Sequence, residues 1–89
     1  MRTIWKYRLV VEDEQVINMP MGAVPLTVQA QNGEPCLWCE VDSTLRASAV
    51  KLLTRGTGHP LTGEEGSYIG TYQLQEGGLV FHVFSSKIS

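Results

Sequence analysis

Apolar and polar residues alternate with a period of two along most of the chain, and this alternation constrains the fold more than any other feature. It runs through residues 3–9, where Trp5 and Tyr7 fall on one face of a predicted strand. It returns in residues 24–31. A strand with this pattern buries one face and exposes the other. The sequence therefore predicts half-buried β-strands, with no sustained helical spacing.

Turn signals separate the predicted strands from one another. The strongest is Asn32-Gly33, because both residues tolerate the positive φ of a type I′ hairpin. We expect residues 43–49 to form a loop with at most one helical turn. The result is an all-β fold, a single small antiparallel β-sandwich or barrel of about seven strands. The predicted strands cover residues 3–9, 15–19, 24–31, 36–42, 50–55, 67–74 and 79–86.

Length and charge limit the classes of function. The chain has 89 residues, so we expect residues 1–89 to form a single β domain with a thin core. Seven basic and nine acidic residues give a formal charge of −2, which argues against binding to a nucleic-acid duplex. The N-terminal stretch lacks the apolar region of a signal peptide, and no segment is long enough to cross a bilayer. We therefore expect a cytosolic protein with no membrane partner and with reduced cysteines.

Four segments carry a resemblance to a known family. They are QNGEPCLWCEVD, GTGHP, YIGTYQ and LVFHVF, in this order along the chain. In this arrangement they resemble a family of short proteins from bacteriophages, prophages and bacteria that is usually labelled only as a domain of unknown function. The resemblance implies no catalytic residue. It implies a setting in mobile elements, where many small proteins antagonise defences in the cytosol of the host cell.

Cys36 and Cys39 form a CxxC pattern, which serves elsewhere in redox and zinc sites. Here the pair lies inside a predicted strand, where three residues separate the Cα atoms by about 10 Å and direct the side chains to opposite faces. A disulfide needs Cα atoms roughly 4.4–6.8 Å apart, so we expect no bridge. Neither His59 nor His82 lies at zinc-finger spacing from the cysteines. We interpret both cysteines as core residues and expect no cofactor and no metal.

Arg2, Lys6 and Arg8 share one face of the first predicted strand. One interpretation is charge on an edge strand that discourages pairing between sheets. The other is a basic strip for an anionic partner. Reversal of the charge separates the two interpretations.

The candidate ligand site lies in RGTGHPLTGEEGSYIG, residues 55–70. Gly56 and Gly58 flank Thr57, and glycines let consecutive amide N–H groups converge on an anion. Arg55 can grip a phosphate or carboxylate with two hydrogen bonds, and Thr57 and His59 add possible donors. The alternative is that the glycines serve only the geometry of a turn between strands.

Two tyrosines extend this candidate site. Tyr68 and Tyr72 are an even number of residues apart, so a regular strand places both on the side of Gly70. If that side is open near the glycines, the tyrosines can stack on a purine or on a side chain of a partner. If it faces inward, they belong to the core.

Two hypotheses of function follow from these residues. The first is a non-enzymatic binding protein that antagonises host defence by sequestering an anionic, nucleotide-like signalling molecule through Arg55, Thr57, His59, Tyr68 and Tyr72. The second is a protein–protein antagonist or assembly component, such as a binder of a host protein, that uses a sheet edge or an aromatic surface. An enzyme ranks third, because His82 has no recognisable nucleophile in triad context. The small core and aromatic-rich strands favour a homo-oligomer.

Overall fold

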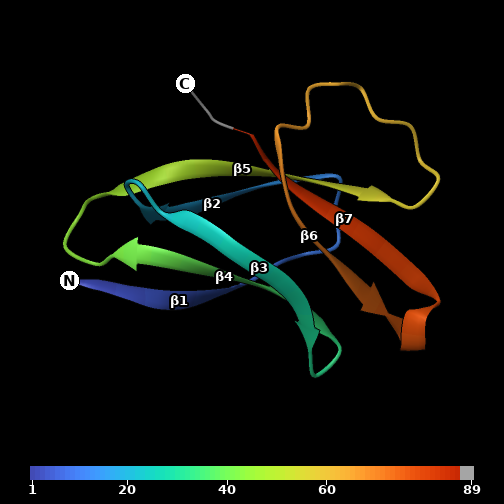
Figure 1. The fold of residues 1–89 in the computed structure, drawn as a ribbon, viewed down its shortest axis with the longest axis horizontal. Helices are drawn as coiled ribbons and strands as arrows, with labels where there is room; N and C mark the ends of the chain where they lie inside the picture. Colours follow the sequence, from blue (N-terminus) through green and yellow to red (C-terminus); the bar gives the residue numbers. More distant parts are fainter. Residues whose placement is uncertain (87–89) are drawn as a thin grey trace.

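The fold is a small β-sandwich, which confirms the predicted class. The computed structural model describes residues 1–86. All strand pairs in it are antiparallel. The strands, shown in Figure 1, are β1 (Arg2–Arg8), β2 (Glu14–Pro20), β3 (Val24–Gln31), β4 (Glu34–Asp42), β5 (Ala47–Gly56), β6 (Ser67–Leu74) and β7 (Leu79–Ser86).

The strands form two sheets. The first, sheet A, has the order β1-β4-β3, and the second, sheet B, has the order β2-β5-β7-β6. The chain crosses between sheets in the links β1–β2, β2–β3 and β4–β5. The Cα atoms span 39 × 30 × 16 Å, and the short dimension fits two sheets stacked about 10 Å apart.

The core lies between the sheets and receives side chains from all seven strands or their ends. Leu37, Cys39 and Val41 of the central strand β4 are fully buried, which matches the period-two expectation for one face of that strand. Leu52 of β5 and Val83 of β7 meet them from sheet B. The remaining buried members of the cluster are Leu9, Met19, Val28 and Tyr72.

One side of the sandwich is closed by a close approach between β3 and β6, which lie side by side without a ladder between them. Gly70 makes this approach possible, because a Cβ there would lie 3.0 Å from Val28 Cγ1 and 3.5 Å from the Val28 amide nitrogen. The opposite side, between β1 and β2, has no comparable contact. The sheets therefore meet along one pair of edges and separate along the other.

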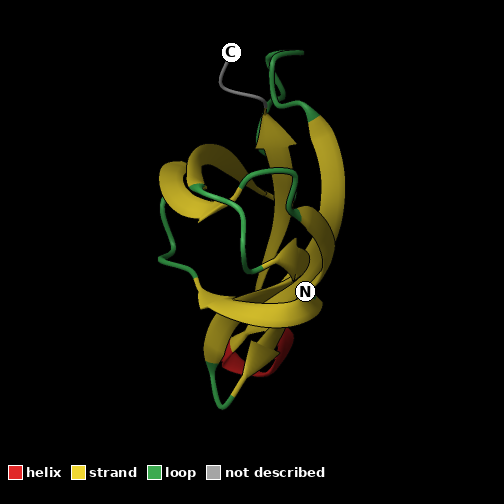
Figure 2. Ribbon diagram, turned by 90° about the vertical axis from the view of Figure 1, so that its left-hand side faces the viewer, coloured by secondary structure: helices red, strands yellow, loops and turns green. Residues whose placement is uncertain are grey.

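The turns follow the sequence prediction with one exception. Asn32 and Gly33 have φ values of 52° and 78°, as the predicted hairpin requires. The loop predicted for residues 43–49 is shorter, since β5 begins at Ala47 and pairs there with Pro20 of β2. Pairing with β2 extends β5 over residues 47–49, although the small and polar residues of this segment have little intrinsic preference for a strand. Among the described residues, the helical segment is one short turn, η1 (Gln75–Gly77), coloured red in Figure 2.

Candidate functional site

The five residues of the predicted anion site divide among three places: Arg55 and Tyr68 lie on the outer face of sheet B, Thr57 and His59 in the loop after β5, and Tyr72 in the core. Arg55, Thr57 and His59 surround the start of the loop that links β5 to β6, residues 57–66, which extends beyond the sheets at the upper right of Figure 1. Tyr68 lies on the outer face of sheet B and is 59% exposed. Tyr72 belongs to the core and is 2% exposed. The structure therefore brings three of the five together near one loop.

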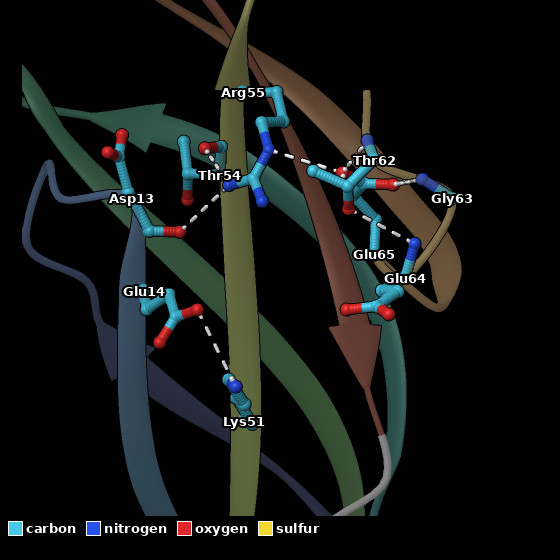
Figure 3. Close-up of polar contacts among 9 residues, drawn as sticks. All are labelled: Asp13, Glu14, Lys51, Thr54, Arg55, Thr62, Gly63, Glu64 and Glu65. Carbon is cyan, nitrogen blue, oxygen red and sulfur yellow. Dashed lines mark hydrogen bonds and ion pairs between the residues drawn. The ribbon is translucent and has the colours of Figure 1, made fainter. Parts of the chain in front are cut away.

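The Arg55 guanidinium is held by partners within the chain, as Figure 3 shows. Its Nε lies 3.4 Å from Oε2 of Glu65, and its Nη1 donates to the carbonyl oxygens of Asp13 and Thr54. The side chains of Arg55 and Glu65 are only 17% and 5% exposed. An anionic ligand at Arg55 has to compete with a carboxylate that is already in place.

Glu65 is the central acceptor of the loop. It accepts hydrogen bonds from the Thr62 amide at 2.8 Å, the Thr62 hydroxyl at 3.0 Å and the Gly63 amide at 2.9 Å. These hydrogen bonds lower the pKa of the Glu65 carboxyl to about 2, and the bond from the Thr62 amide has the largest effect. The carboxylate is therefore ionised at physiological pH, and its contact with Arg55 attaches the loop to β5 of sheet B.

Two backbone amides near Gly56 and Gly58, at the predicted anion site, already donate to acceptors within the chain. The Thr57 amide donates to the Val80 carbonyl at 3.2 Å, and the His59 amide donates to the Gly56 carbonyl at 3.0 Å. The second bond closes a tight turn in which Gly58 has φ of 89°. Turn geometry therefore accounts for Gly58, while two of the amides that would grip an anion are used internally.

A β-bulge separates the two tyrosines. The register with β7 shifts between Tyr68 and Gly70, so Tyr68 stands opposite Phe84 whereas Tyr72 stands opposite Phe81. The expectation that both tyrosines share a side is wrong, because the extra residue of a bulge reverses the alternation. Tyr72 is a core residue, the inward alternative foreseen from the sequence. Tyr68 packs edge-on against Phe84 with ring centroids 5.7 Å apart.

His82 lies within a chain of hydroxyl groups on the outer face of sheet B. Its Nε2 lies 2.7 Å from the Thr57 hydroxyl, and its Nδ1 lies 2.8 Å from the Thr71 hydroxyl. The Thr71 hydroxyl is also hydrogen-bonded to the Tyr68 hydroxyl. Both ring nitrogens have partners, so this histidine of β7 is linked to β6 and to the loop after β5 and offers no unoccupied nitrogen to a substrate.

Both cysteines are buried, but only Cys39 belongs to the core between the sheets, because Cys36 stands opposite Arg8 on the other face of sheet A. Cys36 and Cys39 are free thiols within β4, and both are buried. Burial raises the pKa of the Cys39 thiol to about 11, which keeps it protonated and unreactive. Within residues 1–86, the histidine, cysteine and carboxylate side chains form no group of three with the geometry of a metal site.

The two larger hollows near the predicted residues differ in the charge of their walls. One of about 470 Å³ is lined by Arg55 and His59 together with Asp13, Glu14 and Pro60. The other, of about 670 Å³, lies between the ends of several strands, and none of the described residues that line it is charged. Tyr68, Leu26, Pro25 and Ile69 contribute apolar surface to it. The first is suited to polar groups of mixed charge, and the second to apolar ones.

The basic residues of β1 share one face of the strand, as predicted, and the structure shows that this is the outer face of sheet A. Each has a neighbour there. Arg2 Nε lies 2.7 Å from a carboxylate oxygen of Glu40, and Arg8 Nη1 lies 3.1 Å from one of Glu34. Lys6 donates to the side-chain amide oxygen of Gln31 at 2.7 Å, so its charge meets a neutral group. All three basic side chains stay exposed at the margin of the sheet.

Among residues 1–86, the backbone of β1 is hydrogen-bonded to another strand on one side only. The Leu9 amide donates to the Pro35 carbonyl, and the Ser43 amide donates to the Met1 carbonyl. Because bonded pairs recur at every second residue of an antiparallel ladder, the odd-numbered residues of β1 bond to β4. The N–H and C=O groups of Arg2, Ile4, Lys6 and Arg8 therefore point away from β4, toward the open edge.

Two large apolar side chains of β1, Ile4 and Trp5, are exposed at this edge. Trp5 stands opposite the buried Cys39, so it lies on the core-facing side of sheet A, yet it is 41% exposed. Ile4 is more exposed still, on the outer face. The strands of sheet B make no extensive contact with β1 in the described structure, although Tyr7 reaches the core. The strand thus exposes apolar side chains on both faces next to unpaired backbone groups.

Sequence reasoning did not identify Glu65 as a central residue. The signal was present in Thr62-Gly63-Glu64-Glu65, the S/T-x-x-E spacing of a capping box, in which the glutamate accepts from the amide of the first residue. The Thr62 amide makes that bond here, although no helix follows. The ion pair between Glu65 and Arg55 joins residues that are ten positions apart in the sequence, and no local sequence pattern predicts such a pair.

The comparisons with known proteins give a family but no activity. A family model described as Domain of unknown function (DUF7352) matches residues 1–89. No curated protein and no solved structure matches the chain. Over residues 1–86, no helix has the length and apolar character required to span a membrane.

Proposed function

The chain belongs to this family of unknown function, and we propose that it is a non-catalytic protein-binding domain that accepts an extended strand of a partner protein at the open edge of β1. One observation carries the proposal. Four consecutive outward pairs of N–H and C=O groups, at Arg2, Ile4, Lys6 and Arg8, have no strand beside them in the described structure. Such a row is the template used in recognition by strand addition.

The other edges are less suited to this use. In the described structure the edges of β3 and β6 face each other across the closed side of the sandwich. The outward groups of β2 belong to its even-numbered residues, because the Asp13 carbonyl and the Met21 amide bond to β5 and its preceding turn. This row ends at Pro20, which has no N–H to donate. β1 contains no proline, so its row is uninterrupted.

Strand addition predicts a definite pattern of amide protection. In the protein alone, the amides of Ile4, Lys6 and Arg8 exchange rapidly with solvent, while those of Trp5 and Tyr7 are protected by β4. A bound strand protects the even-numbered amides as well. Hydrogen exchange measured by NMR, residue by residue, reads both states.

Two variants at one position test the proposal. Ile4→Pro removes an outward N–H and disturbs no bond to β4, whereas Ile4→Ala removes the same side chain and keeps the N–H. A partner isolated from the source cell must bind wild type and Ile4→Ala, fail to bind Ile4→Pro, and protect the even-numbered amides. Equal binding to both variants, with both folded by circular dichroism, overturns the proposal.

An anionic, nucleotide-like ligand is the second candidate. The hollow of about 470 Å³ supports it, because Arg55 and His59 meet there. Asp13, Glu14 and the paired Glu65 weigh against it, because they add negative charge around the same guanidinium. Thermal unfolding with cyclic dinucleotides and ADP-ribose-type compounds measures it, since a ligand stabilises by RT ln(1 + [L]/Kd). A flat response across the panel rejects this candidate.

The setting that we propose follows the resemblance found in the sequence. We place the protein in the cytosol of a bacterial host, encoded by a phage or prophage, with a host defence protein as the partner that β1 engages. Defence assays in the host with wild type, Ile4→Ala and Ile4→Pro test this setting. Loss of the anti-defence effect only in Ile4→Pro supports it, and an equal effect of all three rejects it.

A further inference from the structure

We infer that the strand received by β1 carries carboxylate groups on the face that continues the outer face of sheet A and apolar side chains on the face that continues the core. This inference rests on the proposed function and adds the chemistry of the partner. The two faces of β1 differ at the edge, and a paired strand extends both faces.

The outer face at the edge is basic. Arg2, Lys6 and Arg8 point from it, with Ile4 between the first two. The arginine side chains remain 54% and 68% exposed although Glu40 and Glu34 contact them, and Lys6 contacts only a neutral amide. Side chains directly opposite in an antiparallel pair have Cβ atoms about 4.5–5.5 Å apart, close enough for a carboxylate to pair with these cations.

The other face at the edge is apolar. Trp5 lies there beside the buried Cys39, and Tyr7 packs against the core from the same face. A strand placed next to β1 would set its alternate side chains against the exposed part of Trp5. Apolar side chains at those positions extend the core, whereas charged ones would be desolvated without a partner.

A second copy of the chain fits this edge poorly. If two β1 strands pair about a two-fold axis with Ile4 opposite Lys6, then Arg2 stands opposite Arg8. If Ile4 stands opposite its own copy, then Arg2 stands opposite Lys6. Either register brings like charges together, which destabilises a strand pair. The occupant that the charges favour is therefore an acidic strand of another protein, and the self-association predicted from the small core uses a different surface.

Synthetic peptides that match β1 in length test the inference. The first peptide alternates Glu with Val, the second alternates Lys with Val, and the third has the composition of the first with the alternation broken. Titrations followed by NMR give the dissociation constants and identify the protected amides. We expect the alternating Glu peptide to bind about tenfold tighter than either of the other two, a preference that weakens as salt is added.

Charge reversal gives the matched control. Lys6→Glu changes a residue whose contact is with a neutral amide, so the fold should tolerate it, and Lys6→Gln removes the charge without reversing it. We expect the preference for the Glu peptide to shrink in Lys6→Gln and to vanish or reverse in Lys6→Glu. Ile4→Pro should lose binding of all alternating peptides.

The outcomes separate the inference from the proposed function. If wild type binds the Glu and Lys peptides equally and Ile4→Pro binds neither, strand addition stands and the inference about charge is overturned. If Ile4→Pro binds as well as wild type, or no alternating peptide binds, strand addition itself is overturned. If sedimentation instead shows self-association that Ile4→Pro abolishes, the occupant is a second copy, and the inference fails.

Discussion

The loop of residues 57–66 and the edge strand β1 each contact a neighbouring strand through an arginine–glutamate pair, and the surroundings of the two pairs differ. Glu65 of the loop contacts Arg55 of β5, and Arg2 of β1 contacts Glu40 of β4. Arg2 and Glu40 lie 2.7 Å apart at the surface, with side chains 54% and 41% exposed. Arg55 and Glu65 lie farther apart, at 3.4 Å, but are 17% and 5% exposed. Water screens the shorter pair, whereas the longer pair is desolvated and hydrogen-bonded to the loop. Burial and supporting bonds, more than distance, decide which pair stabilises the fold.

The largest expected effect comes from Gly66, where the loop joins β6. A Cβ there would lie 2.2 Å from the Ser85 carbonyl oxygen, and φ is 92°, so Gly66→Ala has to displace backbone. We expect a loss of about 3 kcal/mol or more in the free energy of unfolding, measured by urea denaturation. Gly63→Ala is the control, because φ is 90° but no atom lies within 4 Å, and it should cost roughly 1–2 kcal/mol. Equal costs would mean that the loop is not packed on β7.

Removal of the Glu65 carboxylate comes next. Glu65→Ala leaves Arg55 without its ion pair and the amides of Thr62 and Gly63 without their acceptor. We expect the melting temperature to fall by roughly 10 °C. The neighbouring Glu64→Ala removes an exposed carboxylate and should leave it almost unchanged. A similar fall in both variants would show that the effect is one of net charge.

The pH dependence of stability sharpens the same contrast. Folding lowers the pKa of Glu65 from about 4.5 to about 2, so its stabilisation is complete above pH 4.5 and is lost as the pH falls toward 2. Glu65→Gln should therefore unfold more easily than wild type at neutral pH, with the difference narrowing in acid. Asp42, whose pKa the Thr44 hydroxyl and amide hold well below its usual range, keeps its own acid dependence in both proteins. A constant difference across this range would contradict the assignment.

The smallest effect is expected at the surface pair. Arg2→Ala removes the contact with Glu40 but leaves that carboxylate in water, so we expect the melting temperature to change by less than about 3 °C. The change should also diminish in high salt. A loss comparable with that of Glu65→Ala would abolish the distinction between the two regions.

The sequence predicts much of the framework because strand alternation and the Asn32-Gly33 turn are local signals. It also places Arg2, Lys6 and Arg8 on one face of the first strand, and the pairing with β4 agrees. The opposite orientation of Tyr68 and Tyr72 could not be predicted, because it results from a bulge that is defined only by the pairing of β6 with β7.

The candidate site depended on contacts across the chain. The pairing of Arg55 with Glu65 is a tertiary contact, and a count of glycines cannot reveal whether their amides are already used. Likewise, alternation predicts that residues 3–9 form a strand, but the order of the described strands is needed to show that none of them pairs with the second side of β1.

The close approach of β3 to β6 at Gly70 and Val28 has a consequence for stoichiometry. If β1 accepts a strand as we propose, it is the edge with an uninterrupted row of outward N–H and C=O groups, because β3 and β6 close one flank and Pro20 interrupts the row on β2. On this proposal, strand addition joins one partner strand to each chain, and the complex does not elongate into a fibre.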